Sequence, residues 1–333
     1  MLPARPPLLE CPPHVPLTAA TPTPVPLPAD ADVEEGGMKA PSVGPVEAAL
    51  LAQLAPAVVA TVHWLPGGGA LRVLEAGAGP TVVLLHGRGG AASQWFTYLT
   101  VLARSHRVLA VDLPGFGMSS TPEGPLATGE DAAAFFTAPI EALLSQLAPG
   151  PVAVVGHSLG GLVALELALR GRVPVERLAL VDAMGLGPEM ARKARLFFRA
   201  GPERLARSLG PWAWAQLMPP PPTPLGERLG ALEYELHTRP GASPDAARAF
   251  NRLVPVAGPV FHRAEKLDAI TAPVLLVWGE HEDTLPVSIA EQAARRLPQA
   301  RLLRLDAGHS PHQERPERVL PELKAFLAAP QEH

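Results

Sequence analysis

A serine between two glycines stands where an apolar run meets an apolar, helix-like stretch. The residues Gly156-His157-Ser158-Leu159-Gly160 directly follow the apolar run 151–155. A G-x-S-x-G at such a junction is typical of a nucleophile elbow, in which a sharp strand-to-helix turn presents the serine hydroxyl. Side chains larger than hydrogen at the two glycine positions would collide in so tight a turn. The pattern predicts that Ser158 is a nucleophile, and the alternative is an ordinary glycine-serine loop.

A serine hydroxyl becomes reactive when a base takes its proton and a carboxylate orients that base. Both residue types occur downstream, in loops that follow apolar runs. The run 273–278 leads into the acidic loop 279–286, and the run 301–305 leads into the histidine-containing loop 306–312. These segments supply candidates for the acid and for the base.

Five short blocks together resemble the α/β-hydrolase superfamily, in that family's order, over residues from about 70 to the C-terminus. The blocks are residues 84–90, 112–119, 156–161, 278–279 and 308–309. The resemblance implies an α/β fold with a mostly parallel central sheet flanked by helices, and a helical cap inserted after the sixth strand. The alternation of strand-like and helix-like segments independently favours a parallel sheet with right-handed crossovers.

The resemblance also implies the groups that would stabilise an oxyanion. These are the backbone N–H groups of Arg88, which follows His86-Gly87, and of Leu159, which follows the serine. Preorganised donors of this kind lower the energy of a tetrahedral intermediate. Asp112 occupies a position that is architectural in the family, so we do not expect it to be the acid.

His309 is the expected base, because it follows Gly308 at the end of the last apolar run, where the family places its catalytic histidine. His312 and His281 are the rival histidines. Residues 314–317 resemble the start of the family's terminal helix, with Pro316 suited to the first helical turn. That register supports His309.

The acid is open between neighbouring residues. In relatives, the acid usually lies four residues after the tryptophan and four residues before a proline. In this sequence, counting from Trp278 and counting back from Pro286 both give Glu282. Aspartate is the more frequent acid in such triads, and Asp283 is one place further on. Asp182, at the end of another apolar run, is a third possibility.

Composition excludes several other classes of protein. The chain has 333 residues, of which 47% are hydrophobic, and this is ample for a sheet covered on both faces. The net charge of −4 gives no reason to expect nucleic-acid binding. Cys11 is the only cysteine, so an intramolecular disulfide or a thiolate metal cluster cannot form. No run is long enough to span a membrane. We expect a cytoplasmic protein that needs no cofactor or metal.

Residues 1–45 hold 12 of the 41 prolines, which predicts a disordered tail, and Met38 is an alternative start. Prolines interrupt any apolar core of a secretory signal there. We expect hydrolase core over 46–184 and 269–333, with the helical cap over 185–268. Within the core, residues 58–64 and 71–75 predict a hairpin, and residues 129–147 predict a helix.

Several large side chains are candidates for the substrate pocket. They are His157, Phe197, Phe198, Trp212, Trp214 and Met218. Residues 190–210 also carry six basic side chains against Glu203 alone. Such a face could attract an anionic substrate, an acidic acyl carrier or a lipid surface, and the alternative is a solvated helix face.

Together these features predict a serine hydrolase that cleaves a carboxylic ester or a related acyl bond of a small molecule. Ser158 would form an acyl-enzyme, which water then resolves. C–C bond hydrolysis, thioesterase, lactonase, acyltransferase and perhydrolase reactions could use the same triad. A non-catalytic ligand-binding module is the alternative from a different class. A serine at the elbow argues against dehalogenase and epoxide hydrolase relatives, which use aspartate.

Overall fold

The apolar runs of the sequence form the strands of one sheet. The computed structural model describes residues 38–39, 44–54, 58–220, 224–238 and 243–329. The strands are β1 (Met38–Lys39), β2 (Val59–Trp64), β3 (Ala70–Ala76), β4 (Thr81–Leu85), β5 (Arg107–Val111), β6 (Val152–His157), β7 (Val175–Val181), β8 (Val274–Gly279) and β9 (Ala300–Leu305). Residues 58–64 and 71–75, expected as a hairpin, correspond to the antiparallel pair β2 and β3.

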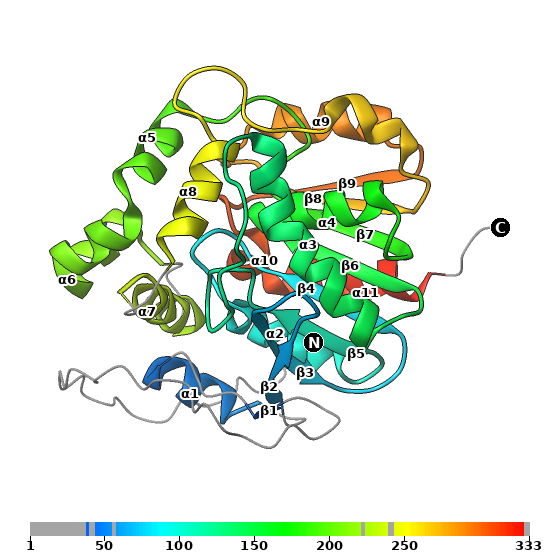
Figure 1. Cartoon of the computed structure of the whole chain (residues 1–333), viewed down its shortest axis with the longest axis horizontal. Helices are drawn as coiled ribbons and strands as arrows, with labels where there is room; N and C mark the ends of the chain where they lie inside the picture. Colours follow the sequence, from blue (N-terminus) through cyan, green and yellow to red (C-terminus); the bar gives the residue numbers. More distant parts are fainter. Residues whose placement is uncertain (1–37, 40–43, 55–57, 221–223, 239–242, 330–333) are drawn as a thin grey trace, which may run out of the picture. The chain divides into compact units, whose positions relative to one another are not determined.

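The strands lie in the order β1-β2-β3-β5-β4-β6-β7-β8-β9 (Figure 1). The first four in this order pair antiparallel, and every pair from β5 to β9 is parallel. Parallel strands end at the same edge of a sheet, which is where open α/β sheets place their ligands. The loops after β4, β6, β7, β8 and β9 therefore meet at one edge.

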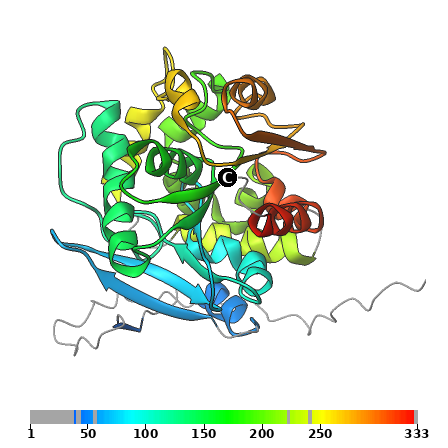
Figure 2. The same ribbon diagram turned by 90° about the vertical axis from the view of Figure 1, so that its right-hand side faces the viewer.

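Helices cover both faces of the sheet. The helices of the core are α1 (Pro45–Leu51), η1 (Ala92–Trp95), α2 (Phe96–Leu102), α3 (Gly129–Leu147), α4 (Leu159–Arg170), η2 (Ala264–Ala269), α9 (Val287–Arg296), α10 (Pro311–Glu314) and α11 (Pro316–Ala328). Figure 2 shows α3 and α4, in green, on one side of the sheet, with α11 in red and α2 in cyan on the other. The expected mostly parallel sheet flanked by helices is confirmed.

Successive residues of the central strands face opposite layers of the core. Val154 packs in the cluster that contains Phe136 of α3, whereas Val155 packs in the cluster that contains Leu99 of α2. Burial of each such side chain contributes about 1.5–3 kcal/mol. The continuous apolar run of β6 is thus explained by burial on both faces.

Between β7 and β8, the described part of the chain forms four α-helices, which precede the short helix η2. They are α5 (Arg192–Ala200), α6 (Pro202–Leu217), α7 (Pro224–Thr238) and α8 (Pro244–Leu253), called here the α5–α8 segment. In Figure 1 they lie together at the left, and α8 packs against α3. A break divides α6 at Gly210, where φ is 77°, a backbone conformation that glycine adopts without strain. Pro211 follows it.

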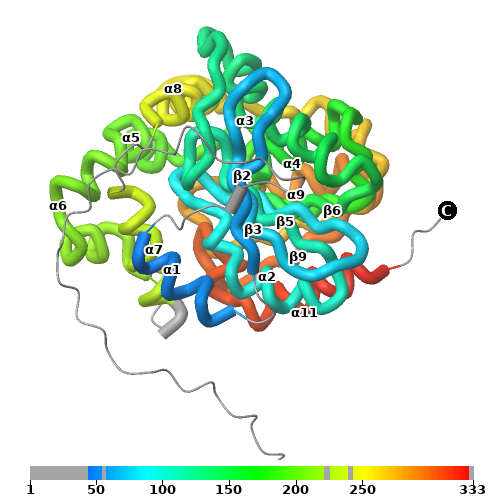
Figure 3. Tube along the Cα trace, turned by 60° about the horizontal axis from the view of Figure 1, so that its bottom comes forward, coloured from blue at the N-terminus to red at the C-terminus, as the bar shows by residue number. Residues whose placement is uncertain are grey.

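Helix α1 is joined to the body by buried charges. Arg72 of β3 forms ion pairs with Glu47 of α1 at 2.8 Å and with Asp112 after β5 at 3.3 Å. Asp112 also accepts the amide hydrogen of Ala92 at 2.6 Å, so its role is architectural. Figure 3 shows α1 beside α7, where Glu235 accepts amide hydrogens from the first turn of α1.

Most of the predicted proline-rich tail lies outside the described residues, which leaves its proposed disorder untested. Within the range 1–45, Met38 and Lys39 form β1 and Pro45 begins α1. No helix among the described residues is both long and apolar enough to cross a lipid bilayer.

Candidate active site

Ser158 occupies a strained turn between β6 and α4. Its backbone has φ 50° and ψ −112°, a conformation that residues other than glycine rarely adopt. A Cβ atom at Gly156 would lie 2.2 Å from the carbonyl oxygen of Gly160, and one at Gly160 would lie 2.4 Å from that of Leu85. The two glycines of the motif are therefore required by backbone contact. The turn has the geometry expected of a nucleophile elbow.

His309, in the loop after β9, lies beside Ser158. Its Nε2 is 3.1 Å from the serine Oγ, which is hydrogen-bonding distance. Its Nδ1 forms a close hydrogen bond with Oε2 of Glu282, in the loop after β8. With the Nδ1 proton directed at the carboxylate, Nε2 is left free to accept the serine proton. The three side chains form a continuous chain of hydrogen bonds.

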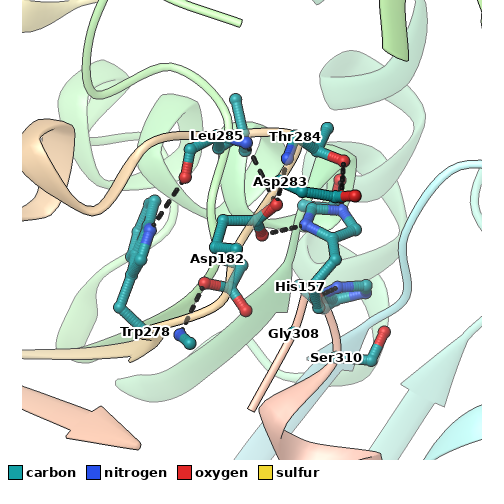
Figure 4. Close-up of polar contacts among 12 residues, drawn as sticks. His157, Asp182, Trp278, Asp283, Thr284, Leu285, Gly308 and Ser310 are labelled. Atoms are coloured by element: carbon teal, nitrogen blue, oxygen red, sulfur yellow. Dashed lines mark hydrogen bonds and ion pairs between the residues drawn. The ribbon is translucent and has the colours of Figure 1, made fainter. Parts of the chain in front are cut away.

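The loop backbone holds Glu282 in this position. Its second oxygen, Oε1, accepts the amide hydrogen of Leu285 at 3.1 Å and that of Thr284 at 2.5 Å. Its side chain is fully buried. Figure 4 labels Thr284 and Leu285, whose amides donate these hydrogen bonds. The carboxylate is thus fixed by three partners.

Asp283 points elsewhere. Its side chain is 63% exposed and pairs with Lys193 of α5 at 2.5 Å. Thr284 also donates its hydroxyl hydrogen to it at 3.4 Å. Of the two acids that the sequence left open in this loop, the structure brings Glu282 to His309 and directs Asp283 to the α5–α8 segment.

Asp182, the third candidate acid, lies buried behind the same histidine. Its Oδ1 accepts the amide hydrogen of Gly279 at 3.1 Å (Figure 4), and its Oδ2 has no partner among the described residues. Burial, followed by the nearby charge of Glu282, raises the pKa of Asp182 well above its ordinary value. Both effects favour the neutral carboxyl group.

Among the described residues, Asp182, Glu282 and His309 form a group that could hold a metal ion, because their ligand atoms lie within 4.8 Å of one another. The histidine nitrogen nearest the carboxylates, Nδ1, is already hydrogen-bonded to Glu282. A metal there would have to break that bond. The arrangement therefore suits a hydrogen-bonded triad better than a metal centre.

The environment of His309 favours its charged form. Burial lowers its pKa, but the charge of Glu282 and their hydrogen bond outweigh burial and raise the pKa to about 9. Stabilisation of an imidazolium is what a general base next to a serine requires during the reaction.

Two further histidines pack around His309. The ring of His157 lies 5.0 Å from that of His309 and 4.5 Å from that of His312. His157 donates from Nε2 to the carbonyl oxygen of His309 at 2.8 Å, which helps to hold the loop. His312 is buried against Trp95, and burial lowers its pKa to about 3. The other rival, His281, is exposed and pairs with Asp306.

The 87–90 loop, after β4, faces the elbow. A Cβ atom at Gly87 would lie 2.7 Å from Nδ1 of His157 and 3.4 Å from the Cβ of Ser158. No described residue accepts a hydrogen bond from the backbone amide of Arg88 or of Leu159. The two amides expected to bind an oxyanion therefore have no acceptor within the described part of the chain.

The pocket candidates divide into three groups. Phe198 packs on Phe250 of α8, with ring centroids 4.9 Å apart, and Phe197 lies 5.7 Å from Phe198. Trp214 is buried against His237, at 5.0 Å. Met218 is half-buried at the end of α6, and Trp212 is 77% exposed. Trp212 follows the break at Gly210 and faces solvent.

The six basic residues of the stretch 190–210 differ in their partners and in their exposure to solvent. Lys193 pairs with Asp283, and Arg195 donates to backbone carbonyl groups, including that of Met190. The other four are exposed, namely Arg192, Arg199, Arg204 and Arg207. The only acid of the stretch, Glu203, is turned inward and pairs with Arg88 at 2.7 Å. Sequence reasoning missed this pair, although a single acid among six basic residues was a signal.

Comparison with known proteins agrees with this architecture. The sequence model of the alpha/beta hydrolase family matches residues 82–322. An uncharacterized protein of Mycobacterium tuberculosis is 29% identical over 273 residues, covering 76% of each chain. The solved 2-hydroxy-6-oxo-6-phenylhexa-2,4-dienoate hydrolase of Rhodococcus sp. RHA1 shares 25% identity with a TM-score of 0.68, covering 82% of this chain and all of that one.

Carboxylesterase CesB of Bacillus subtilis shares the fold at 22% identity, with a TM-score of 0.68 over 86% of this chain and 97% of that one. The family match spans most of the chain and includes nearly all of β4, strands β5 to β9, and the loops that carry Ser158, Glu282 and His309. The chain is a hydrolase and belongs to the α/β-hydrolase family.

Proposed function

We propose that this protein is a serine hydrolase that cleaves a carboxylic ester, or a closely related acyl bond, of a small molecule. The observation that carries the proposal is the unbroken hydrogen-bonded chain from Ser158 through His309 to Glu282. Each group stands in the order and at the distance that nucleophilic acyl transfer needs.

In the first half of the reaction, Ser158 Oγ attacks the substrate carbonyl carbon while His309 Nε2 takes the hydroxyl proton. The resulting oxyanion accepts hydrogen bonds from the amides of Arg88 and Leu159. When the C–O bond to the leaving group breaks, His309 returns the proton to the departing alcohol. Glu282 stabilises the imidazolium throughout and remains ionised.

In the second half, His309 removes a proton from water, and the resulting hydroxide attacks the acyl-enzyme. Collapse of the second tetrahedral intermediate releases the carboxylic acid, and the proton returns to Ser158 Oγ. Every proton and bond is accounted for by the three side chains, the substrate and water, so the proposed cycle needs no cofactor.

We assign the α5–α8 segment as the cap of this site, within residues 185–268, between the core portions 46–184 and 269–333. The contacts of Arg88 with α5, α6 and α8 support this role, because they place the segment next to the proposed oxyanion donors. Phe197, Phe198, Trp214 and Met218 remain candidates for the acyl pocket. An anionic substrate or acyl carrier could approach the exposed arginines of α5 and α6.

The test is covalent labelling of Ser158 by a fluorophosphonate probe, combined with turnover of p-nitrophenyl esters of increasing chain length. The Ser158→Ala variant should lose labelling and at least 10³-fold in kcat. Ser145→Ala is a matched control, since that hydroxyl donates to Glu141 O within α3. Labelling of Ser158→Ala at the wild-type rate would contradict the proposal.

C–C bond hydrolysis is the second candidate, favoured by the likeness to the Rhodococcus hydrolase. It would use the same three side chains but a ketone substrate. Thioesters, lactones and a vinylogous 1,5-diketone should be assayed beside the esters. A kcat/KM for the diketone that exceeds the ester values by more than about tenfold would favour this alternative.

A further inference from the structure

Arg88 links the proposed oxyanion site to the α5–α8 segment through its side chain. The guanidinium lies 2.7 Å from Oε1 of Glu203 and 3.0 Å from its Oε2. Glu203 lies in the first turn of α6, 115 residues away in the sequence. The Arg88 side chain is only 4% exposed, although its backbone belongs to a loop at the sheet edge.

Helices on either side enclose this ion pair. The guanidinium carbon lies 5.3 Å from the ring centroid of Phe198 on α5 and 5.3 Å from that of Phe250 on α8. Both contacts are within the range of a cation–π interaction. At Gly89, the residue after Arg88, a Cβ atom would lie 2.8 Å from Nε2 of His237 on α7. All four helices of the segment therefore border the 87–90 loop.

This burial is costly for the charges involved. An ion pair taken out of water gains little net stability, because the loss of hydration offsets most of the attraction between the charges. The Nε of Arg88 is also buried without a partner among the described residues. Burial acts to raise the pKa of Glu203, but the charge of Arg88 and the hydrogen bonds to the carboxylate together outweigh burial and lower the pKa, which favours ionised Glu203. General stability is thus a weak explanation for this pair.

The position of Arg88 beside the elbow suggests a more specific explanation for the ion pair. We propose that the Arg88–Glu203 pair is a latch, an ion pair through which the α5–α8 segment holds the backbone amide of Arg88 in position to bind the oxyanion. Glu203 is then a positioning residue that never contacts the substrate. This inference rests on the proposed serine hydrolase function, because the amide matters only if an oxyanion forms.

If the pair is a latch, its removal should weaken binding of the transition state and leave binding of the substrate ground state unchanged. Removal of an entire oxyanion donor reduces kcat by about 10²–10³. A donor that is present but less well held should cost less, roughly 10- to 100-fold. KM for a small ester should change little, since the ground-state carbonyl binds the amide only weakly.

The experiment compares Glu203→Gln, which removes the charge at nearly constant shape, with Glu227→Gln, an exposed glutamate of α7. Two quantities are measured beside KM: kcat for a p-nitrophenyl ester and the Ki of a trifluoromethyl ketone, whose adduct with serine carries an oxyanion. In Glu203→Gln both should worsen in parallel by roughly 10- to 100-fold. Glu227→Gln should match the wild type.

Two further variants test the coupling. Arg88→Gln retains the backbone amide but loses the charge, and the double variant Arg88→Gln/Glu203→Gln should be no worse than the poorer single variant. Glu203→Asp keeps the charge on a shorter stem and should give an intermediate loss. It also serves if Glu203→Gln fails to fold.

The outcomes separate the latch from the function on which it rests. If Glu203→Gln and Glu203→Asp lower only the melting temperature and leave kcat and Ki at wild-type values, the pair is a structural anchor and the latch is refuted. If wild-type protein binds no trifluoromethyl ketone and its Ser158 resists the fluorophosphonate probe, the proposed function fails first, and the latch fails with it.

Discussion

Asp182 and Glu282 bring two carboxyl groups within 4.8 Å of one histidine, His309, from the ends of the neighbouring strands β7 and β8. Their environments differ sharply. Glu282 accepts hydrogen bonds from the histidine and from two backbone amides, whereas one oxygen of Asp182 is buried without a partner among the described residues. Burial, followed by the charge of Glu282, raises the pKa of Asp182 and so favours its neutral form.

The first prediction concerns the choice of acid. Glu282→Gln should reduce kcat by on the order of 10²–10⁴ with little change in KM, because an amide favours the wrong imidazole tautomer. Asp283→Asn should cost less than tenfold, since this exposed carboxylate acts on His309 only through the local field. Steady-state kinetics of the pair decides the assignment. The reverse order of effects would transfer the role to Asp283.

A second prediction follows from the raised pKa of Asp182. Asp182→Asn resembles the protonated carboxyl group in shape and charge, so kcat/KM at pH 7 should stay within about threefold of the wild type. Difference infrared spectroscopy should lose the band of a protonated carboxyl group in this variant. A loss of activity as large as that of Glu282→Gln would show instead that Asp182 is ionised and orients the base.

The third prediction is the dependence of the rate on pH. His309 accepts the serine proton only when it is neutral. Burial lowers its pKa, but the charge of Glu282 and their hydrogen bond outweigh burial and raise the pKa to about 9. The free enzyme should therefore show kcat/KM that rises about tenfold per pH unit on the acid side and levels off near pH 9.

The pH dependence of kcat/KM measured for Glu282→Gln serves as the control for this prediction. Without the carboxylate charge the pKa of His309 should fall, so the rising limb should move to lower pH while the plateau drops. A limb that stays in place in this variant would contradict the assigned cause of the raised pKa.

A fourth prediction concerns acid stability. Burial lowers the pKa of His312 to about 3, below the value near 6.5 of the unfolded chain. The unfolded state therefore takes up a proton between these two values while the folded state does not. The contribution of neutral His312 is complete above pH 6.5 and is lost as the pH falls toward 3, by up to about 1.4 kcal/mol per pH unit.

Urea unfolding from pH 7.5 to 4.5 measures this slope. His312→Phe should flatten the fall in the free energy of unfolding, because a ring that cannot be protonated replaces the imidazole between Trp95 and His157. His281→Gln, on the surface, should leave the slope unchanged. An equal slope in wild type and His312→Phe would assign the acid sensitivity to other groups, such as His157.

Local sequence determined the nucleophile turn and the strands around it. The glycines flanking Ser158 are required by backbone contacts, those of Gly156 with Gly160 four residues later and those of Gly160 with Leu85 on the neighbouring strand. Such contacts recur wherever this turn forms. The apolar runs predicted the buried strands for the same kind of reason, because a strand covered on both faces must be apolar throughout. Chain order then placed the base and acid loops at one edge of the sheet.

Only the tertiary structure decided which side chains of those loops meet. Glu282 and Asp283 are adjacent and chemically alike, and no periodicity sets the direction of a side chain in an irregular loop. The amides of Thr284 and Leu285 turn Glu282 inward, while Lys193, on a distant helix, attracts Asp283. The pair between Arg88 and Glu203 likewise joins residues 115 apart, so it exists only once the helices have packed over the loop.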